Sequence, residues 1–85
     1  MYHLIVKPSA EKQFAKLPPQ LRRRITKAFD GLRENPRPRG CVKLQGEEDL
    51  WRIRVGDFRV VYTIEDDELI VLVVRVAHRK DVYQE

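Results

Sequence analysis

The sequence is poor in the residues that stabilise secreted proteins and in the apolar runs that cross membranes. Its 85 residues include a single cysteine, Cys41. One cysteine cannot form an internal disulfide, so we expect a reducing compartment and place the protein in the cytoplasm. No stretch approaches the roughly 18 apolar residues of a membrane span. The apolar run after Met1 is also too short for a signal peptide, so we expect neither a leader nor a membrane segment.

Several catalytic motifs are missing as well. Histidine, aspartate and glutamate do not cluster at metal-ligand spacing, and the acidic run at 66–68 resembles a solvated hairpin tip. There is no glycine-rich phosphate loop. Cys41 has no obvious base near it, which argues against nucleophilic catalysis by its thiol. We therefore expect a protein without metal or cofactor.

Positive charge is abundant and lies mainly in the first half of the chain. Residues 1–42 contain ten Lys/Arg and three Asp/Glu, whereas residues 43–85 contain seven and ten. A concentrated positive field attracts polyanions, although charge runs also form solvated helix faces, so both interpretations stay open here. The candidate nucleic-acid contacts are Arg22, Arg23, Arg24, Lys27, Arg37, Arg39 and Lys43.

Apolar periodicity predicts one domain, residues 1–85, with the order strand, two helices, three strands. The first strand covers 2–7, and Ser9 would cap a helix from 10 to about 17. Pro19 starts a second helix from about 20 to 34. Its apolar stripe comprises Leu21, Ile25, Ala28, Phe29 and Leu32. Strands follow at about 50–55, 58–65 and 69–77, with tight turns at 56–57 and 66–67. The predicted fold class is α+β, a mostly antiparallel four-stranded sheet with the helical hairpin on one face.

The first predicted β-hairpin separates two kinds of side chain. A two-residue turn at 56–57 pairs Arg54 with Arg59 and Arg52 with Val61, and opposed residues share a face. One face then carries the residues expected beneath the helices: Trp51, Ile53, Val55, Phe58, Val60 and Tyr62. The other face carries three arginines and, by this reasoning, no carboxylate from the same strands.

Three arginines on one face repel each other, and a ligand that brings negative charge would remove the conflict. Arginine suits phosphate because its planar fork donates two hydrogen bonds at once. A solvated basic face is the simpler alternative. The basic C-terminal segment adds His78, a possible acid–base residue, together with Arg79 and Tyr83. Taken singly, His78 and Tyr83 could equally be a polar strand end and a packed tail.

The order and spacing of several short motifs resemble the RelE/ParE toxin superfamily, and its RelE branch in particular. The matching segments run along almost the whole chain: YHLIVK at 2–7, PSA at 8–10, LP at 17–18, KLQG at 43–46, WRIRVGDFRVVY at 51–62 and VRVAHRKDVY at 74–83. The resemblance implies a toxin that a cognate antitoxin silences. It implies cleavage of messenger RNA in the ribosomal A site, by attack of the 2′-hydroxyl on the neighbouring phosphate, without a metal.

The same resemblance assigns roles by position to residues that the strand pattern and the basic C-terminal segment had singled out: Arg52, Arg54, Arg59, Arg79 and Tyr83. Well-studied members have lysine where this chain has Arg52 and Arg54. Arginine cannot act as a general base, but it can stabilise the negative charge of a phosphorane. We therefore expect the arginines to hold phosphate, and Tyr83 or His78 to take the proton of the 2′-hydroxyl.

The expected partners are messenger RNA, ribosomal RNA in the A site and an acidic or amphipathic antitoxin. We expect a monomer when free and a hetero-oligomer with the antitoxin. One rival is a ParE-like toxin, which shares the scaffold but inhibits DNA gyrase and is not a nuclease. Another rival is an inactive RNA-binding scaffold, which should expose aromatic residues for base stacking.

Overall fold

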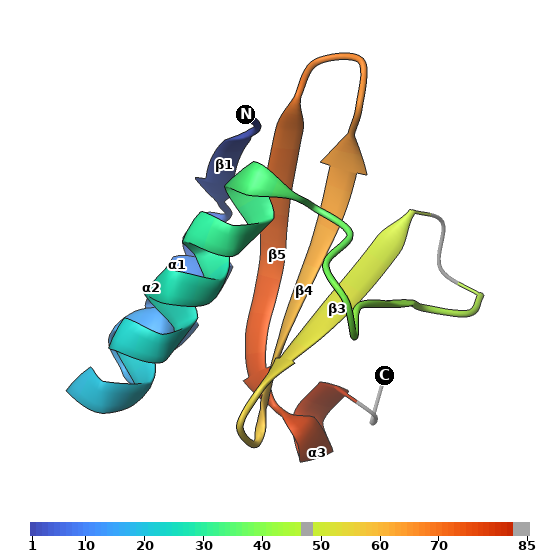
Figure 1. Cartoon of the computed structure of the whole chain (residues 1–85). Coiled ribbons are helices and arrows are strands. Elements are labelled where there is room, and N and C mark those ends of the chain that lie inside the picture. Colours follow the sequence, from blue (N-terminus) through green and yellow to red (C-terminus); the bar gives the residue numbers. More distant parts are fainter. Residues whose placement is uncertain (47–48, 83–85) are drawn as a thin grey trace.

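Two helices pack on one side of a single β-sheet in the computed structural model, which describes residues 1–46 and 49–82 (Figure 1). The elements, in chain order, are β1 (His3–Val6), α1 (Pro8–Ala15), α2 (Pro19–Glu34), β2 (Val42–Lys43), β3 (Leu50–Val55), β4 (Phe58–Glu65), β5 (Ile70–His78) and α3 (Arg79–Val82). The strands lie in the order β1-β5-β4-β3-β2. Among the described residues, no helix is both long and apolar enough to cross a membrane. The α+β class is confirmed.

Each of the first two helices begins at a proline. The fixed φ of proline suits the first helical position, where its missing N–H is not needed. This confirms Pro19 as the start of α2. Helix α1 instead begins at Pro8 with Lys7 at the N-cap, and no side chain of the described residues caps it. The prediction that Ser9 caps a helix starting at Ala10 is therefore wrong by two residues.

The apolar stripe of α2 enters the core as predicted. Ile25, Phe29 and Leu32 are buried, and Phe14 of α1 packs on Phe29 with 5.9 Å between ring centroids. From the sheet, one face joins them: Ile53, Val55, Val60, Tyr62, Ile64, Val71, Val73 and Val76. The core is thus a single layer between the helical hairpin and one face of the sheet.

In the described part of the chain the sheet has five strands, so the predicted count of four is wrong. The extra strand, β2, has only two residues, too few to show alternation in a sequence. β1 is parallel to β5, and the remaining pairs are antiparallel. The two-residue turn at 56–57 is confirmed, and Gly56 supplies the positive φ of 61° that it needs. The second turn is longer than predicted, because Glu65 pairs with Ile70 and leaves four residues between them.

A β-bulge interrupts β5 at Val74. Tyr62 of β4 pairs with Val73, but its neighbour Val61 pairs with Arg75, so Val74 is the extra residue. The side-chain amide oxygen of Gln13, on α1, accepts a hydrogen bond from the Val76 N–H at 3.0 Å. A helix side chain therefore satisfies a backbone donor just after the bulge, beyond the point where pairing with β1 ends.

Candidate functional site

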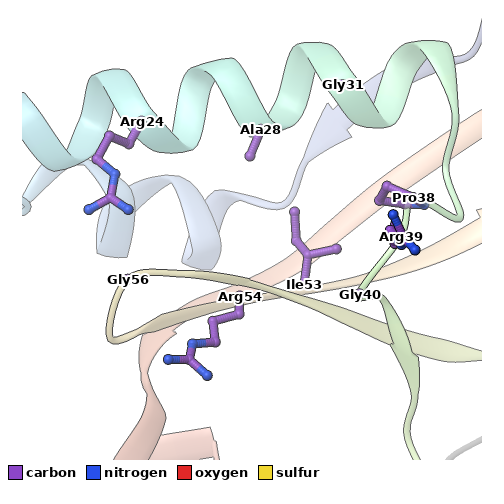
Figure 2. Close-up of a pocket in the computed structure, with 9 residues that line it drawn as sticks. All are labelled: Arg24, Ala28, Gly31, Pro38, Arg39, Gly40, Ile53, Arg54 and Gly56. Carbon is purple, nitrogen blue, oxygen red and sulfur yellow. The ribbon is translucent and has the colours of Figure 1, made fainter.

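Arginines from neighbouring strands meet on the sheet face opposite the helices. Arg54 of β3 pairs directly with Arg59 of β4, and Arg52 pairs with Val61, which confirms the predicted register. Figure 2 shows the alternation at the end of β3: Ile53 points toward α2, and Arg54 points to the other side of the strand. Together with Arg75 of β5, these arginines form what we call the arginine face: Arg52, Arg54, Arg59 and Arg75.

Arg59 is the most buried member of this face, because only 6% of its surface is exposed. Its Nη1 donates to the Phe58 carbonyl oxygen at 3.3 Å, whereas its buried Nε has no hydrogen-bond partner among the described residues. A buried cation normally requires a partner of opposite charge. Arg59 is therefore placed to receive an anion that approaches this face.

The face is not entirely free of carboxylates, contrary to the prediction from the hairpin. Glu65 alternates in phase with Arg59 along β4, so it shares the same side. It lies six residues from Arg59, about 20 Å along an extended strand, and is exposed. Glu65 is too distant to neutralise the arginines at the other end.

Arg75 is the member of the face that the sequence reasoning missed. It pairs with Val61, whose other neighbour is Arg52, so two arginines flank one buried valine. In the next row Arg54, Arg59 and Ala77 lie side by side across three strands. Arg75 is therefore a diagonal neighbour of Arg59, about 7–8 Å away between Cα atoms. The sequence could not place Arg75 on the arginine face, because its side depends on the bulge in β5.

The C-terminal candidates are not all brought to this face. His78 pairs with Phe58, and their rings make an edge contact with 5.5 Å between centroids. Their row neighbour Val55 belongs to the core, so His78 takes the helix-bearing side. Arg79 starts α3, and its N–H donates to the Asp57 carbonyl oxygen at 2.8 Å, next to the turn after Arg54. Tyr83 lies outside the described residues.

The predicted RNA-binding cations divide into three groups. Arg22, Arg23 and Lys27 line a shallow groove between α1 and α2, and Arg22 Nη1 also donates to the Ala15 carbonyl oxygen at 3.2 Å. Arg24 and Arg39 line a second groove.

The third group lies over the ring of Trp51, where Arg37 and Lys43 approach the ring centroid at 5.2 and 5.8 Å. The sequence did not show that these cations form three separate groups, because some of them lie on α2 and others on the loop that follows it or on β2.

The second groove has a volume of about 760 Å³ and lies between α2, the loop at 38–40 and the end of β3 (Figure 2). Apolar groups line it from both sides, among them Ala28 of α2 and Ile53 of β3. The Arg24 guanidinium reaches the turn after β3, where a Cβ at Gly56 would lie 3.3 Å from its Nη1. The groove thus combines an apolar interior with a basic rim.

The start of the second turn, Asp66, joins three parts of the chain. Both of its carboxylate oxygens accept hydrogen bonds from Arg37, at 3.1 and 2.9 Å, and Oδ1 also accepts one from the Tyr2 hydroxyl at 2.8 Å. The bonds to Arg37 first, and then to Tyr2, lower the pKa of Asp66 to about 2. Asp66 is therefore not only part of a solvated hairpin tip, as predicted, because it also links the turn to Arg37 and Tyr2.

The loop at 35–41 is also fastened from the core side. The Tyr62 hydroxyl, fully buried, donates to the Pro36 carbonyl oxygen at 2.7 Å, and burial raises the pKa of this hydroxyl. Tyr62 and Asp66 thus hold two adjacent residues at the start of this loop, Pro36 and Arg37, against the sheet.

Comparison with known proteins identifies the family of this chain. The family profile described as the ParE toxin of type II toxin–antitoxin systems, parDE, matches residues 4–83. The chain is 30% identical to toxin RelE of Mycobacterium tuberculosis over 84 residues, 98% of this chain and 87% of that one.

Solved structures agree in fold. The crystal structure of the archaeal RelE–RelB complex from Pyrococcus horikoshii superposes with a TM-score of 0.82 at 29% identity, over 92% of this chain and 94% of that one. The isolated Escherichia coli RelE toxin gives 0.81 at 30% identity, over 99% and 93%. The profile match and the identity to toxin RelE show that the chain, with its five-stranded sheet and paired arginines, belongs to the RelE/ParE superfamily of type II toxins.

Proposed function

We propose that this protein is a ribosome-dependent messenger-RNA endonuclease toxin, and the observation that carries the proposal is the arginine face. Opposed arginines on neighbouring strands are unfavourable without an anion between them. Arg59 adds a buried guanidinium whose Nε has no hydrogen-bond partner among residues 1–46 and 49–82. A phosphodiester is an anion of suitable size, and it presents two oxygens to a planar guanidinium.

In the proposed reaction, the 2′-oxygen forms a bond to the neighbouring phosphorus and the bond to the 5′-oxygen breaks. The departing 5′-oxygen takes a proton from solvent water, which balances the proton lost by the 2′-hydroxyl, and the products are a 2′,3′-cyclic phosphate and a 5′-hydroxyl. Arg52, Arg54, Arg59 and Arg79 would stabilise the extra negative charge of the phosphorane. Arginine keeps its proton, so another group must accept the proton of the 2′-hydroxyl.

Tyr83 is the first choice for that proton in this proposal, and His78 the second. His78 packs against Phe58 on the helix-bearing side of the sheet, away from the paired arginines. The proposal requires positive charge close to Tyr83, because positive charge lowers the pKa of a phenol and favours the tyrosinate. In this proposal side chains accept the proton of the 2′-hydroxyl and stabilise the charge of the phosphorane, and no step is assigned to a metal.

The partner proposed for the free toxin is a cognate antitoxin. Relatives of this fold have been crystallised as RelE–RelB complexes. The groove beside α2 has an apolar interior with Arg24 and Arg39 at its rim, which suits an amphipathic or acidic segment. Binding there and over the arginine face would both stabilise and silence the toxin.

Primer extension on a defined message in a purified translation system tests the nuclease proposal. We expect cuts that require ribosomes and that disappear in Arg79→Ala. Arg33→Ala is a matched control, because Arg33 forms an exposed ion pair with Asp30 on α2 and has no proposed role. Cuts that persist in Arg79→Ala would contradict the assignment of this arginine.

Gyrase inhibition is the second candidate, and the family profile favours it because that profile describes ParE toxins. Such an inhibitor would not need paired arginines to bind phosphate. A supercoiling assay with purified gyrase separates the two functions. Inhibition of gyrase without any cleavage of message would replace the nuclease proposal.

A further inference from the structure

The β-bulge in β5 decides which side of the sheet Arg75 occupies. From the second turn onward, regular pairing runs from Glu65 with Ile70 to Tyr62 with Val73. If that register continued, Arg75 would face Val60 in the core and Val76 would face Arg59. The extra residue, Val74, shifts the pairing by one, so Arg75 faces Val61 and joins the arginine face.

The same shift satisfies the core. It places Val76 opposite Val60, and both residues are buried, at 2% and 0% exposure. Bulges commonly re-aim a side chain beside a functional site. Gln13 accepts the Val76 N–H, so the irregular backbone is also fastened from α1.

We propose that Arg75 is a substrate-binding residue that holds the phosphate next to the scissile one. This inference deepens the proposed function, because it takes the ligand to be single-stranded RNA. Arg75 lies on β5, diagonal to Arg59 and on the side remote from Arg54. A strand that places one phosphate between Arg54 and Arg59 can reach Arg75 with its neighbour.

The test measures binding separately from cleavage. The probe is a 12-nucleotide, fully 2′-O-methylated RNA, which lacks the attacking hydroxyl, and its Kd is measured by fluorescence anisotropy across salt concentrations. Arg75→Gln removes the charge at similar length, and Arg75→Lys keeps it. Arg33→Gln is the control for loss of one positive charge elsewhere.

We expect Arg75→Gln to raise Kd about tenfold at low salt, as for the loss of one hydrogen bond to a charged group. The slope of log Kd against log salt should fall by about 0.7, which corresponds to one phosphate contact in single-stranded nucleic acid. Arg75→Lys should restore the slope, and Arg33→Gln should leave it unchanged.

The outcomes separate this inference from the proposed function. A lowered slope for Arg75→Gln supports the inference even if the wild-type protein cuts no message. An unchanged slope overturns it, even if the wild-type protein cuts message on ribosomes. Failure of the wild-type protein to bind the probe at low salt would also overturn it. In the cleavage assay, loss of a uniform binding contact should raise KM more than it lowers kcat.

Discussion

At the scale of single residues, Arg59 combines burial with a side-chain N–H that no described residue accepts. A buried, incompletely paired charge lowers the stability of the free protein, and an apolar side chain of similar volume often restores it. Arg59 is 6% exposed and its Nε is unpartnered among the described residues. Arg59 should therefore lower the free energy of unfolding of the free toxin, although the proposed function requires it to bind phosphate.

Replacing Arg59 with methionine should separate these two effects. We expect Arg59→Met to raise the free energy of unfolding by about 1 kcal/mol, because the desolvated charge is removed. Ribosome-dependent cleavage should be lost. Urea denaturation and primer extension would measure the two quantities, with Arg33→Met as the exposed control. A less stable Arg59→Met protein would show that the native site already satisfies this guanidinium.

The proton acceptor can be identified by a pair of substitutions. We expect Tyr83→Phe to lower the single-turnover cleavage rate by a factor of about 10² to 10⁴, the usual contribution of a general base. His78→Phe, which retains an aromatic ring against Phe58, should have a smaller effect. If neither substitution lowers the rate by about tenfold or more, both residues are excluded as the base.

At the scale of elements, the turn between β4 and β5 is tied to the loop after α2 by Asp66. The folded pKa of Asp66, about 2, is lower than the ordinary value of 3.8. A carboxyl with a depressed pKa adds stability above its unfolded pKa and loses it as pH falls through the folded pKa. The contribution should therefore be complete above about pH 5 and lost between about pH 4 and pH 2.

Asp66→Asn tests this dependence, because the amide keeps the shape but cannot ionise. The wild-type protein should be more stable than the variant near neutral pH, and the difference should shrink as pH falls from about 4 to 2. Urea unfolding at several pH values measures it. A difference that stays constant down to pH 2.5 would show that the ion pair with Arg37 contributes nothing.

A side chain from another element contacts the backbone just after the bulge in β5. Gln13→Ala removes the acceptor of the Val76 N–H, which should cost about 1 kcal/mol of folding free energy. We also expect reduced RNA binding if the loss lets β5 slip toward the regular register. Lys12→Ala, a neighbouring position on α1, is a control for helix effects. Unchanged amide exchange at Val76 in the Gln13 variant would refute this account.

At the scale of the whole molecule, the basic groove between α1 and α2 is separate from the arginine face. Reversing Arg22, Arg23 and Lys27 to glutamate should weaken ribosome binding and its salt dependence, since long-range attraction to RNA follows the summed charge. Cosedimentation with ribosomes measures binding. Ribosome binding at the wild-type level would show that this groove does not contact ribosomal RNA.

Local patterns in the sequence were sufficient for the α+β class, the apolar stripe of α2, the two-residue turn at Gly56 and the pairing of Arg54 with Arg59. Each depends on helical or strand periodicity or on turn chemistry, which act over a few residues. The proline starts were visible too, although the first helix was placed two residues late.

Long-range contacts decided the rest. The two-residue strand β2 forms only because β3 is beside it, and the parallel pairing of β1 depends on the path of the helical hairpin. The bulge at Val74 turned Arg75 onto the arginine face and His78 onto the opposite one, because one extra residue reverses the alternation that follows it. A period-two pattern in the sequence has no means of showing that reversal. In the shifted register Val76 packs into the core and its N–H donates to Gln13, and both are contacts with residues far away in the sequence.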